Sequence, residues 1–376
     1  MHDDYASILV IATRQIGDVL LTTPLIRAAR RRWPAARIDV LGLPGTLGML
    51  RGNPDITACI EAPRGGGWRR QFGFLRRMWR RYDLALVTQQ SDRAHLYGAI
   101  AARVRAGLLP ERDGTSWWKR RLLIHAVTTA GDRGDVHTAD EKLALLDPWR
   151  GADAAPVDVV APSPAPLPDD LERQLAPRFV VVQVPSMWRY KQWPVEHFRS
   201  VVDRLARDGL QVVLTGGAAQ GDRAKVAEVR PSGDATSVID MAGRLDLNQL
   251  AALLQRAALY IGPDTSVTHL AAALRVPMVV AFGPTNPVRW GPLPGGVPGA
   301  AAYARRAAEP QRAGRIVLLQ GPDRPTTPGC VPCGRAGCDD HRDSRSLCLE
   351  GIAPERVIAE ARRLLGTDHR EDRAAR

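Results

Sequence analysis

Two side chains in the stretch "VPSMWRYKQWP" (184–194) could bind phosphate. Ser186 can hydrogen-bond a phosphate oxygen, and Lys191, just before a Trp-Pro pair, can neutralise charge that develops on a departing diphosphate. The lysine would do this as a cation, without a metal ion. A loop lysine is also commonly a solvated surface residue, so this stretch predicts a site only if a second phosphate-binding loop lies beside it.

The stretch "GPDTSVTHLAAAL" (262–274) could be that second loop. Its Gly-Pro pair predicts a turn, after which Asp264 or Thr265 can cap a helix. The backbone N–H groups of Thr265 and Ser266 would then lie at the positive end of the helix dipole, where they can bind an anion. His269, slightly further along, can add a hydrogen bond. An ordinary N-cap explains the same pattern, but two such loops together predict a diphosphate site.

A carboxylate, Asp18, stands at the break between a predicted strand and a predicted helix. It lies in "RQIGDVLLTTP" (14–24), after the apolar run "ILVIAT" (8–13) and before a helical stretch over 19–33. An acid at this place can cap the helix through its side chain. It can also act as a general base. The residues around it leave both roles open.

Short apolar runs alternate with longer amphipathic stretches, which is typical of parallel sheets covered by helices. The Pro/Ala-rich segment 161–170 separates two such series and predicts a linker. The sequence therefore predicts an α/β protein of two Rossmann-like, doubly wound domains facing each other across a cleft, with ligands at the carboxyl ends of the strands. The predicted strands are 8–13, 37–43, 57–62 and 84–90 in the first series, and 179–184, 211–217, 237–243, 259–264 and 278–283 in the second.

The domain boundaries follow from this division. Residues 1–165 are expected to form an N-terminal domain, and residues 166–350 a C-terminal domain with a cysteine-rich loop at 330–348. Residues 351–376 are expected to form a last helix and a disordered tail, because the ending "GTDHREDRAAR" is charged and poor in apolar residues.

Two classes of enzyme lack their signatures in this chain. None of the predicted strands is followed by G-x-G-x-x-G, which argues against a dinucleotide-dependent oxidoreductase. The chain has no G-x-x-x-x-G-K-[ST] either, which argues against a P-loop phosphotransferase.

The net charge of +12 and the isoelectric point near 10.1 predict an anionic partner. Nucleic acid, an acidic membrane surface and a phosphorylated small molecule or lipid all fit this charge. No apolar stretch approaches the roughly 18 residues that span a bilayer, and the acidic start "MHDDYAS" is unlike a signal peptide. We therefore expect a cytoplasmic protein, with peripheral membrane contact left open. The aromatic content of 5% and the lack of a known nucleic-acid module argue against nucleic acid.

Residues 64–81, "RGGGWRRQFGFLRRMWRR", contain seven arginines and no acid. On a helical wheel, Phe72, Leu75, Met78 and Trp79 share one side. The arginines on the other side are Arg76, Arg77, Arg80 and Arg81. A solvated basic surface explains this pattern. The alternative is a site for phosphates or sugar acids, which guanidinium groups can bind in pairs.

Four of the five cysteines form a cluster near the end of the chain. Cys330, Cys333, Cys338 and Cys348 have the spacing C-x2-C-x4-C-x9-C, whereas Cys59 stands alone. The first pair has metal-ligand spacing, but the remainder is compressed relative to a zinc ribbon. A structural loop that holds zinc or iron, and free, partly buried thiols, are both open.

Four stretches, taken in their order, resemble the ADP-heptose:lipopolysaccharide heptosyltransferases, glycosyltransferase family 9. The resemblance covers residues 8 to about 365, and the combined order and spacing are more specific than any one motif. Within the family, "SDRAHLYGAIAARVRAGL", "WKRRLLIHAV" and "FGPTNPVRWGP" are most similar to the heptosyltransferase III type, which adds a branch heptose to the inner core. The four stretches are "RQIGDVLLTTPLIRAARRRWP", "YKQWPVEHF", "GPDTSVTHLAAAL" and "VVAFGPTNPVRW".

The resemblance implies a GT-B fold and assigns a role to Asp18. The C-terminal domain would bind mainly the donor, ADP-heptose, and the N-terminal domain mainly the lipid acceptor. Asp18 would be the catalytic base that removes the proton of the acceptor hydroxyl. Lys191 would hold the diphosphate, so the reaction would be a single inverting displacement without a metal or other cofactor.

The resemblance also implies a donor-binding set. Ser186 would lie near the diphosphate, and Leu245, with Gly243 and Arg244 before it, falls where the nucleobase pocket is expected. Asp222 is a candidate acid on the donor side. The residues at the family's D-[ST]-[GA]-x-x-H motif are Asp264, Thr265, Ser266 and His269, with Ser266 in place of the commoner glycine or alanine.

The implied partners are ADP-heptose and a lipopolysaccharide acceptor made of core sugars and lipid A, and not nucleic acid. The arginines expected to bind this acceptor or the anionic leaflet are Arg69, Arg70, Arg76 and Arg77. The protein would then work peripherally at the cytoplasmic face of the inner membrane. The alternatives are a GT-B glycosyltransferase that uses another nucleotide sugar, and a non-catalytic protein that binds anionic lipids or sugar nucleotides.

Overall fold

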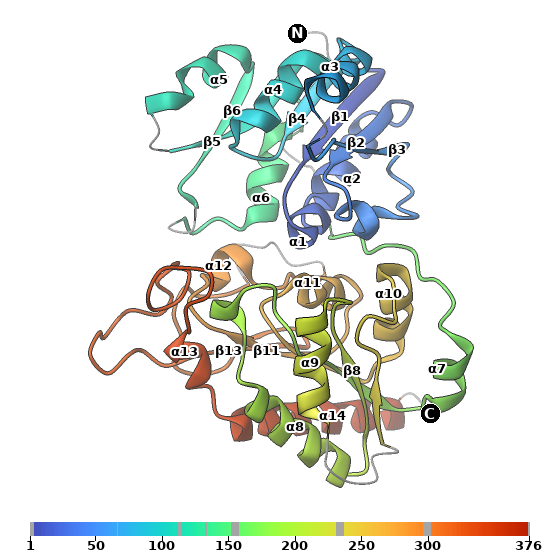
Figure 1. The fold of residues 1–376 in the computed structure, drawn as a ribbon, viewed down its shortest axis with the longest axis vertical. Helices are drawn as coiled ribbons and strands as arrows, with labels where there is room; N and C mark the ends of the chain where they lie inside the picture. Colours follow the sequence, from blue (N-terminus) through green and yellow to red (C-terminus); the bar gives the residue numbers. More distant parts are fainter. Residues whose placement is uncertain are drawn as a thin grey trace. The chain divides into compact units, whose positions relative to one another are not determined.

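The computed structural model describes residues 4–65, 67–111, 114–131, 134–151, 158–230, 237–295 and 302–374. The chain divides into two compact units (Figure 1), and along the chain the division falls between Ser163 and Pro164. Each unit is built on one sheet with helices on both faces, so the predicted α/β class with two Rossmann-like halves is confirmed. No helix in the described ranges is long and apolar enough to cross a membrane.

The first unit has a parallel sheet in the order β3-β2-β1-β4-β5-β6, which is the strand order of a Rossmann fold. Its strands are β1 (Ser7–Ala12), β2 (Arg37–Gly42), β3 (Ala58–Glu61), β4 (Tyr82–Val87), β5 (Ala102–Pro110) and β6 (His125–Thr129). Its helices are α1 (Ile16–Leu20), α2 (Thr23–Arg32), α3 (Gly67–Met78), α4 (Asp92–Ala101), α5 (Trp117–Leu122) and α6 (Thr138–Leu143).

The central strand β1 is apolar throughout because both of its faces are covered. Ile8 and Val10 pack into the cluster on the side of α2, whereas Leu9 and Ile11 pack into the cluster under α3 and α4. Side chains alternate between the two faces of a strand, so a continuous apolar run is what a central parallel strand requires. The run "ILVIAT" therefore gave a correct prediction of this strand.

The prediction of one helix over residues 19–33 is wrong. The chain forms two helices, α1 and α2, which separate at Leu21 and Thr22. Pro24 has no backbone N–H and stands in the first turn of α2, a position that suits proline. The Thr22 hydroxyl donates to the carbonyl of Asp18 at 2.8 Å, and the Thr23 hydroxyl to the carbonyl of Leu20 at 2.7 Å. The two threonines and the proline therefore end one helix and begin the next.

Helix α3 buries only part of the apolar side that the helical wheel indicated. Phe74 and Met78 are 6% and 4% exposed and pack on the sheet. Phe72 and Trp79, which share a side with Met78 on the wheel, are both 63% exposed. The segment is amphipathic as expected, but two of its aromatic rings face solvent.

The second unit repeats the strand order of the first. Its sheet runs β12-β13-β11-β10-β7-β8-β9, with every pair parallel except β12 and β13. Its strands are β7 (Phe179–Gln183), β8 (Gln211–Thr215), β9 (Val238–Asp240), β10 (Leu259–Pro263), β11 (Met278–Phe282), β12 (Gln311–Ala313) and β13 (Ile316–Gln320). Its helices are α7 (Asp169–Gln174), α8 (Val195–Arg207), α9 (Gln220–Val229), α10 (Leu247–Arg256), α11 (Ser266–Ala273), α12 (Pro287–Trp290), α13 (Leu347–Glu350) and α14 (Pro354–Ala374).

Helix α14 closes one face of the second sheet. Val357, Ala361 and Leu364 belong to the cluster that α8 forms with β7 and β10. The helix extends to Ala374 and so includes most of the stretch for which the sequence predicted a disordered tail. Its apolar residues recur at helical spacing, so they lie on one face of the helix and pack on the sheet.

Candidate active site

In sheets with this strand order, ligands bind at the carboxyl ends of the strands, where the order reverses. The reversal lies between β1 and β4 in the first unit, and between β7 and β10 in the second. Asp18 follows β1, Ser186 and Lys191 follow β7, and Asp264 follows β10. Each of these predicted residues thus lies at the carboxyl edge of its own sheet.

Lys191 and Asp264 form an ion pair in the second unit. Lys191 Nζ lies 2.6 Å from Asp264 Oδ2, and joins the loops after β7 and β10. The Lys191 side chain is 23% exposed and that of Asp264 is 7% exposed. The carboxylate is therefore the buried partner, and the ammonium group is the one that a ligand can reach.

The loop that carries Lys191 is held by its own side chains. Gln192 accepts a hydrogen bond from the backbone N–H of Ser186 at 2.9 Å and donates to the carbonyl of Val184 at 3.0 Å. The Ser186 hydroxyl, on a residue 5% exposed, donates to the carbonyl of Trp188 at 3.2 Å. Its proton is thus directed into the loop, and a phosphate oxygen, which can only accept a hydrogen bond, would have to displace this bond.

Helix α11 begins directly after the ion pair. Thr265 is its N-cap residue in an extended conformation, and its side chain makes no capping hydrogen bond. The prediction that Asp264 or Thr265 caps the helix through its side chain is therefore wrong, because the Asp264 carboxylate binds Lys191 instead. Ser266, the first residue of the helix, is partly exposed, and His269 is 6% exposed. The first backbone N–H groups of α11 thus have no side-chain cap from Thr265, and the prediction that they bind an anion stays a prediction.

Gly262 lets the strand before this helix pass close to a buried tyrosine. A Cβ atom at residue 262 would lie 2.4 Å from the hydroxyl oxygen of Tyr260. That hydroxyl also pairs with Thr268 Oγ1 at 2.8 Å, and Thr268 donates to the carbonyl of Pro263 at 2.6 Å. Burial raises the pKa of Tyr260 well above its ordinary value. The turn before α11 is therefore fixed by an internal network, and the glycine is required by packing.

Leu245 and Asp222 lie at the same edge of the second sheet. Leu245 is partly buried in the turn between β9 and α10, and Asp222 is in the first turn of α9, which follows β8. Gly243, with φ of +69°, would bring a Cβ atom within 2.7 Å of the Ala218 Cα atom. Arg244, predicted beside the nucleobase, forms an ion pair with Asp170.

Asp18 is the third residue of α1 and lies in the first unit. Its carbonyl accepts hydrogen bonds from Lys142 Nζ at 2.7 Å and from the Thr22 hydroxyl. Its carboxylate Oδ1 is 4.0 Å from Lys142 Nζ, and its side chain is 14% exposed. The cap residue of α1 is Gln15, which makes no side-chain capping bond, so capping does not explain Asp18.

Lys142 was not predicted as a site residue. It lies on α6, within the "ADEKLALL" stretch, and its side chain is 3% exposed. A lysine in an amphipathic helix is ordinarily a surface residue, so nothing local in the sequence indicates its burial. Its neighbour Glu141, also buried, accepts a hydrogen bond from Thr129 at 2.6 Å.

The loop after β4 supports the loop that precedes Asp18. With the Gln89 amide oriented so that its nitrogen donates to Thr13 Oγ1 at 2.8 Å, its oxygen accepts from the backbone N–H groups of Thr13 and Arg14, also at 2.8 Å. The strands that flank the reversal point in the first sheet are therefore joined through side chains.

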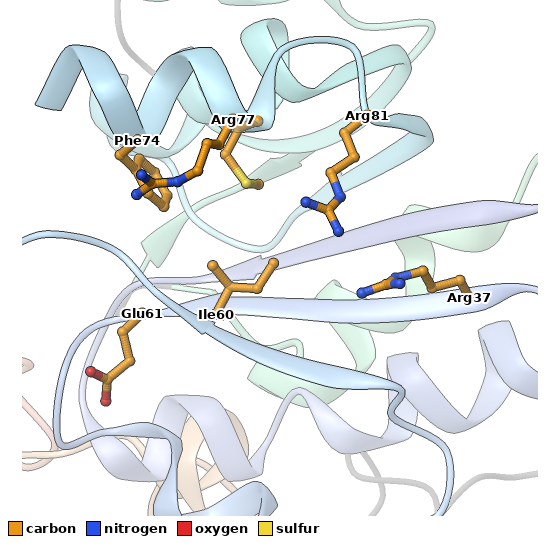
Figure 2. A pocket seen from close by; sticks show the side chains of 7 residues that line it. Arg37, Ile60, Glu61, Phe74, Arg77 and Arg81 are labelled. Atoms are coloured by element: carbon orange, nitrogen blue, oxygen red, sulfur yellow. The ribbon is translucent and has the colours of Figure 1, made fainter.

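The arginines predicted for the acceptor all lie on α3 and are exposed. They are Arg69, Arg70, Arg76 and Arg77. Arg77 lines a hollow of about 250 Å³ between α3 and the strands β2 and β3, together with Arg37 and Arg81 (Figure 2). The hollow also has a carboxylate, Glu61, at its margin. The structure thus brings Arg77 together with two arginines that were not predicted as acceptor residues.

The cysteine-rich loop packs on the loop that carries Lys191. Ser346 donates to the carbonyl of Tyr190 at 2.7 Å, and the Arg342 guanidinium lies 4.4 Å from the centre of the Trp188 ring.

The cysteines of this loop are free thiols. Burial and the neighbouring Cys333, Cys338 and Cys330 raise the pKa of Cys348 to about 12. Among the described residues, no group of three or more His, Cys, Asp or Glu side chains is placed to hold a metal ion.

Two Rossmann-like units, each with charged residues at the carboxyl edge of its sheet, are the architecture of the GT-B fold. The description "Glycosyltransferase family 9 (heptosyltransferase)" matches residues 72–298, which is more than half of the chain. The chain belongs to this family and is a glycosyltransferase. The family resemblance of the sequence motifs is therefore confirmed.

Relatives of the chain agree with this assignment. It is 31% identical over 288 residues to lipopolysaccharide heptosyltransferase 3 of Escherichia coli, with 73% of this chain and 83% of the relative covered. The structure of E. coli ADP-heptose lps heptosyltransferase II is similar, with a TM-score of 0.69 at 22% identity over 96% of this chain and 99% of that one. E. coli heptosyltransferase WaaC, solved with ADP-2-deoxy-2-fluoro heptose, has a TM-score of 0.64 at 18% identity, with 84% and 93% covered.

Proposed function

We propose that this protein transfers heptose from ADP-heptose to the inner core of lipopolysaccharide, with inversion, as a branch addition of the heptosyltransferase III type. The observation that carries the proposal is the Lys191–Asp264 pair at the start of α11. It places a partly exposed cation beside a helix N-terminus, which suits the diphosphate of a nucleotide sugar. Identity of 31% to a relative named heptosyltransferase 3 supports the choice of acceptor.

The second unit is proposed to bind the donor. Lys191 contacts the diphosphate, and the backbone N–H groups at the start of α11 bind its oxygens. Leu245, in the turn after β9, lies beside the nucleobase. The cation and the helix dipole stabilise the charge on departing ADP, so the chemistry does not call for a metal ion. The proposed donor residues are Ser186, Lys191, Leu245, Asp264, Thr265, Ser266 and His269.

Asp18 of the first unit is proposed to be the catalytic base. As the acceptor hydroxyl oxygen attacks the anomeric carbon, its proton passes to the Asp18 carboxylate. A new carbon–oxygen bond forms while the bond between the anomeric carbon and the diphosphate oxygen breaks, and the electron pair of that bond leaves with ADP. The buried cation of Lys142 holds Asp18 through its carbonyl without forming a close ion pair with the carboxylate.

The acceptor is proposed to be a lipid at the cytoplasmic face of the inner membrane. Its phosphates and sugar acids would meet the exposed arginines of α3, since guanidinium groups bind phosphate oxygens in pairs. This assignment also accounts for the net charge of +12 without nucleic acid.

The test is transfer of heptose from ADP-heptose to a core acceptor that lacks the branch heptose, with a UDP-sugar as the competing donor. The Asp18→Asn variant keeps the size of the side chain but removes the base, so turnover should fall by about 10²–10⁴-fold while donor affinity is retained. Full turnover of Asp18→Asn would rule out the base. Turnover of the UDP-sugar alone would rule out ADP-heptose.

Asp83→Asn is a matched control for this variant. Asp83 lies at the amino end of β4, where its carboxylate accepts hydrogen bonds from the backbone N–H and the hydroxyl of Ser7 at 2.9 and 2.8 Å. It is a partly buried carboxylate of the same unit, at the opposite end of the strands from Asp18. The control should lower thermal stability and leave turnover unchanged.

A further inference from the structure

Helix α3 exposes three aromatic rings in one stripe. Trp68 is 73% exposed, and Phe72 and Trp79 are each 63% exposed. Trp68 and Phe72 are four residues apart and so lie on the same side of α3, and Trp79 follows directly after its last residue. The side chains that hold the helix to the sheet are different ones, Phe74 and Met78. The aromatic stripe of Trp68, Phe72 and Trp79 is therefore surplus to the fold of the first unit, and such patches mark interaction sites.

Arginines surround the aromatic stripe. Residues 64–81 contain seven of them and no acid, and all seven are exposed. The Arg69 guanidinium lies 5.5 Å from the centre of the Trp68 ring, and that of Arg80 lies 5.7 Å from the centre of the Trp79 ring. The surface thus combines apolar rings with a dense positive charge, and its partner must offer both apolar and anionic groups.

The hollow beside α3 is suited to a single phosphate group. Arg81 follows α3, Arg77 lies on it, and Arg37 begins the strand β2 beneath (Figure 2). Ile60, Phe74 and Met78 supply apolar walls, and Glu61 is the one acid of the lining. Arg37 is already paired with Asp39 at 2.9 Å, which leaves Arg77 and Arg81 as the main cations for an anion in the hollow.

We propose that α3 docks on an anionic phospholipid bilayer, with the aromatic stripe inserted at the level of the headgroups. The arginines then bind headgroup phosphates, and one of these phosphates occupies the hollow. Tryptophan and phenylalanine favour the boundary between headgroups and acyl chains, and cationic side chains add attraction to anionic lipid. A second copy of this chain fits poorly, because the contact would bring two sets of arginines together.

The proposed docking of α3 rests on the proposed function in one respect: a lipid acceptor is the reason why the protein would meet a membrane. Binding of the bilayer by α3 needs neither the donor nor the Asp18 carboxylate. Lipid binding by a protein without transferase activity would leave this inference intact and overturn the proposed function. The reverse result, transfer to a water-soluble core acceptor without vesicle binding, would overturn this inference alone.

The experiment is sedimentation of the full chain with vesicles of phosphatidylcholine, either pure or mixed with phosphatidylglycerol. The wild type should bind the mixed vesicles and release them as salt rises, because the headgroup contacts are screened. Trp68→Ser/Phe72→Ser/Trp79→Ser should weaken binding by about tenfold or more, since three rings no longer enter the boundary. Arg77→Gln/Arg81→Gln should weaken binding less and reduce its dependence on salt.

Trp117→Ser is the matched control for the aromatic variant. Trp117 is 62% exposed on α5 of the same unit, and the Arg121 guanidinium lies 5.4 Å from the centre of its ring. This variant should keep its vesicle binding. The aromatic variant and Trp117→Ser should keep their thermal stability and their transfer to a water-soluble core acceptor, because the altered rings are exposed and none of them is a proposed acceptor residue.

Three results would overturn the proposal. The first is vesicle binding by the triple variant that equals that of the wild type, and the second is an equal loss in Trp117→Ser. The third is binding of a single-stranded oligonucleotide, but not of vesicles, that depends on the aromatic stripe, since arginines with exposed rings can also bind nucleic acid.

Discussion

The two units share one strand order but expose opposite members of a lysine–aspartate pair. In the second unit the Lys191 side chain is 23% exposed and that of Asp264 is 7% exposed. In the first unit the Lys142 side chain is 3% exposed and that of Asp18 is 14% exposed. The same scaffold thus presents a cation at one sheet edge and an acid at the other.

The two pairs also differ in which atom of the aspartate the lysine contacts. Lys191 and Asp264 are in direct contact at 2.6 Å, whereas Lys142 donates to the carbonyl of Asp18 and stays 4.0 Å from its carboxylate. A buried partner that binds the backbone holds the exposed group in place without neutralising it. The exposed cation suits a leaving diphosphate, and the exposed acid suits a proton in transfer.

Loss of the exposed cation should lower activity more than loss of the buried lysine. Lys191→Met removes the charge but keeps most of the side-chain length, so kcat/KM should fall by about 10²–10³-fold. The variant also leaves the Asp264 carboxylate buried and unpaired, which should cost about 3–5 kcal/mol if the site cannot admit water. Steady-state kinetics and thermal unfolding measure the two effects.

The double variant Lys191→Met/Asp264→Asn separates these effects. Replacing the carboxylate by a neutral amide removes the unpaired charge, so stability should recover while activity stays low. If activity returned together with stability, Lys191 would have only a structural role, and the contrast between the two units would disappear.

The sequence was informative where a residue's role depends on its local neighbours. The apolar strands around Ile11 and Ile261 have both faces covered and could be predicted from their runs alone. The two loops of the second unit could be predicted to lie together because each follows such a strand. Adjacency of the strands then joins Lys191 to Asp264, as the ion pair shows.

The sequence was uninformative where long-range packing decides. Strand β5 was missed because Arg103 and Arg105 interrupt its apolar pattern. Arg105 is accommodated by hydrogen bonds to the carbonyls of Leu122 and Ala102, which no local pattern indicates. Strand β13 is a plain apolar run, so its omission was an error in prediction and not a lack of signal. Lys142 could not be predicted, because its partner Asp18 is far away in the sequence.

Removal of the buried lysine should have a smaller effect than removal of the exposed one. Lys142→Met loses the bond to the Asp18 carbonyl, so kcat should fall by about tenfold while the KM for the donor is unchanged. In the Asp18→Asn background the same change should cause no further loss of kcat. Additive losses would show that Lys142 acts independently of Asp18.

Overpacking in Gly262→Ala should lower the free energy of unfolding by about 1–3 kcal/mol. In Gly262→Ala the new methyl group would lie 2.4 Å from the Tyr260 hydroxyl oxygen, so the turn before α11 must shift. Gly221→Ala is the matched control, because residue 221 lies on α9 of the same unit and its Cβ would meet nothing within 4 Å. Thermal unfolding should show a loss in the first variant only, and Tyr260→Phe should reduce that loss.

The smallest predicted effect concerns pH and the first unit. His95 lies on α4, with Nε2 3.0 Å from the carbonyl oxygen of Leu108, and burial lowers its pKa from the ordinary value of 6.5. Below pH 6.5 His95 binds a proton in the unfolded chain, whereas in the folded chain it stays neutral until the pH reaches its lowered pKa. The stability contributed by neutral His95 is therefore present above pH 6.5 and declines as the pH falls toward that lowered pKa. His95→Gln cannot titrate, so the difference in unfolding temperature between variant and wild type should change over this range. A constant difference would mean that burial of His95 does not set the acid sensitivity of this unit.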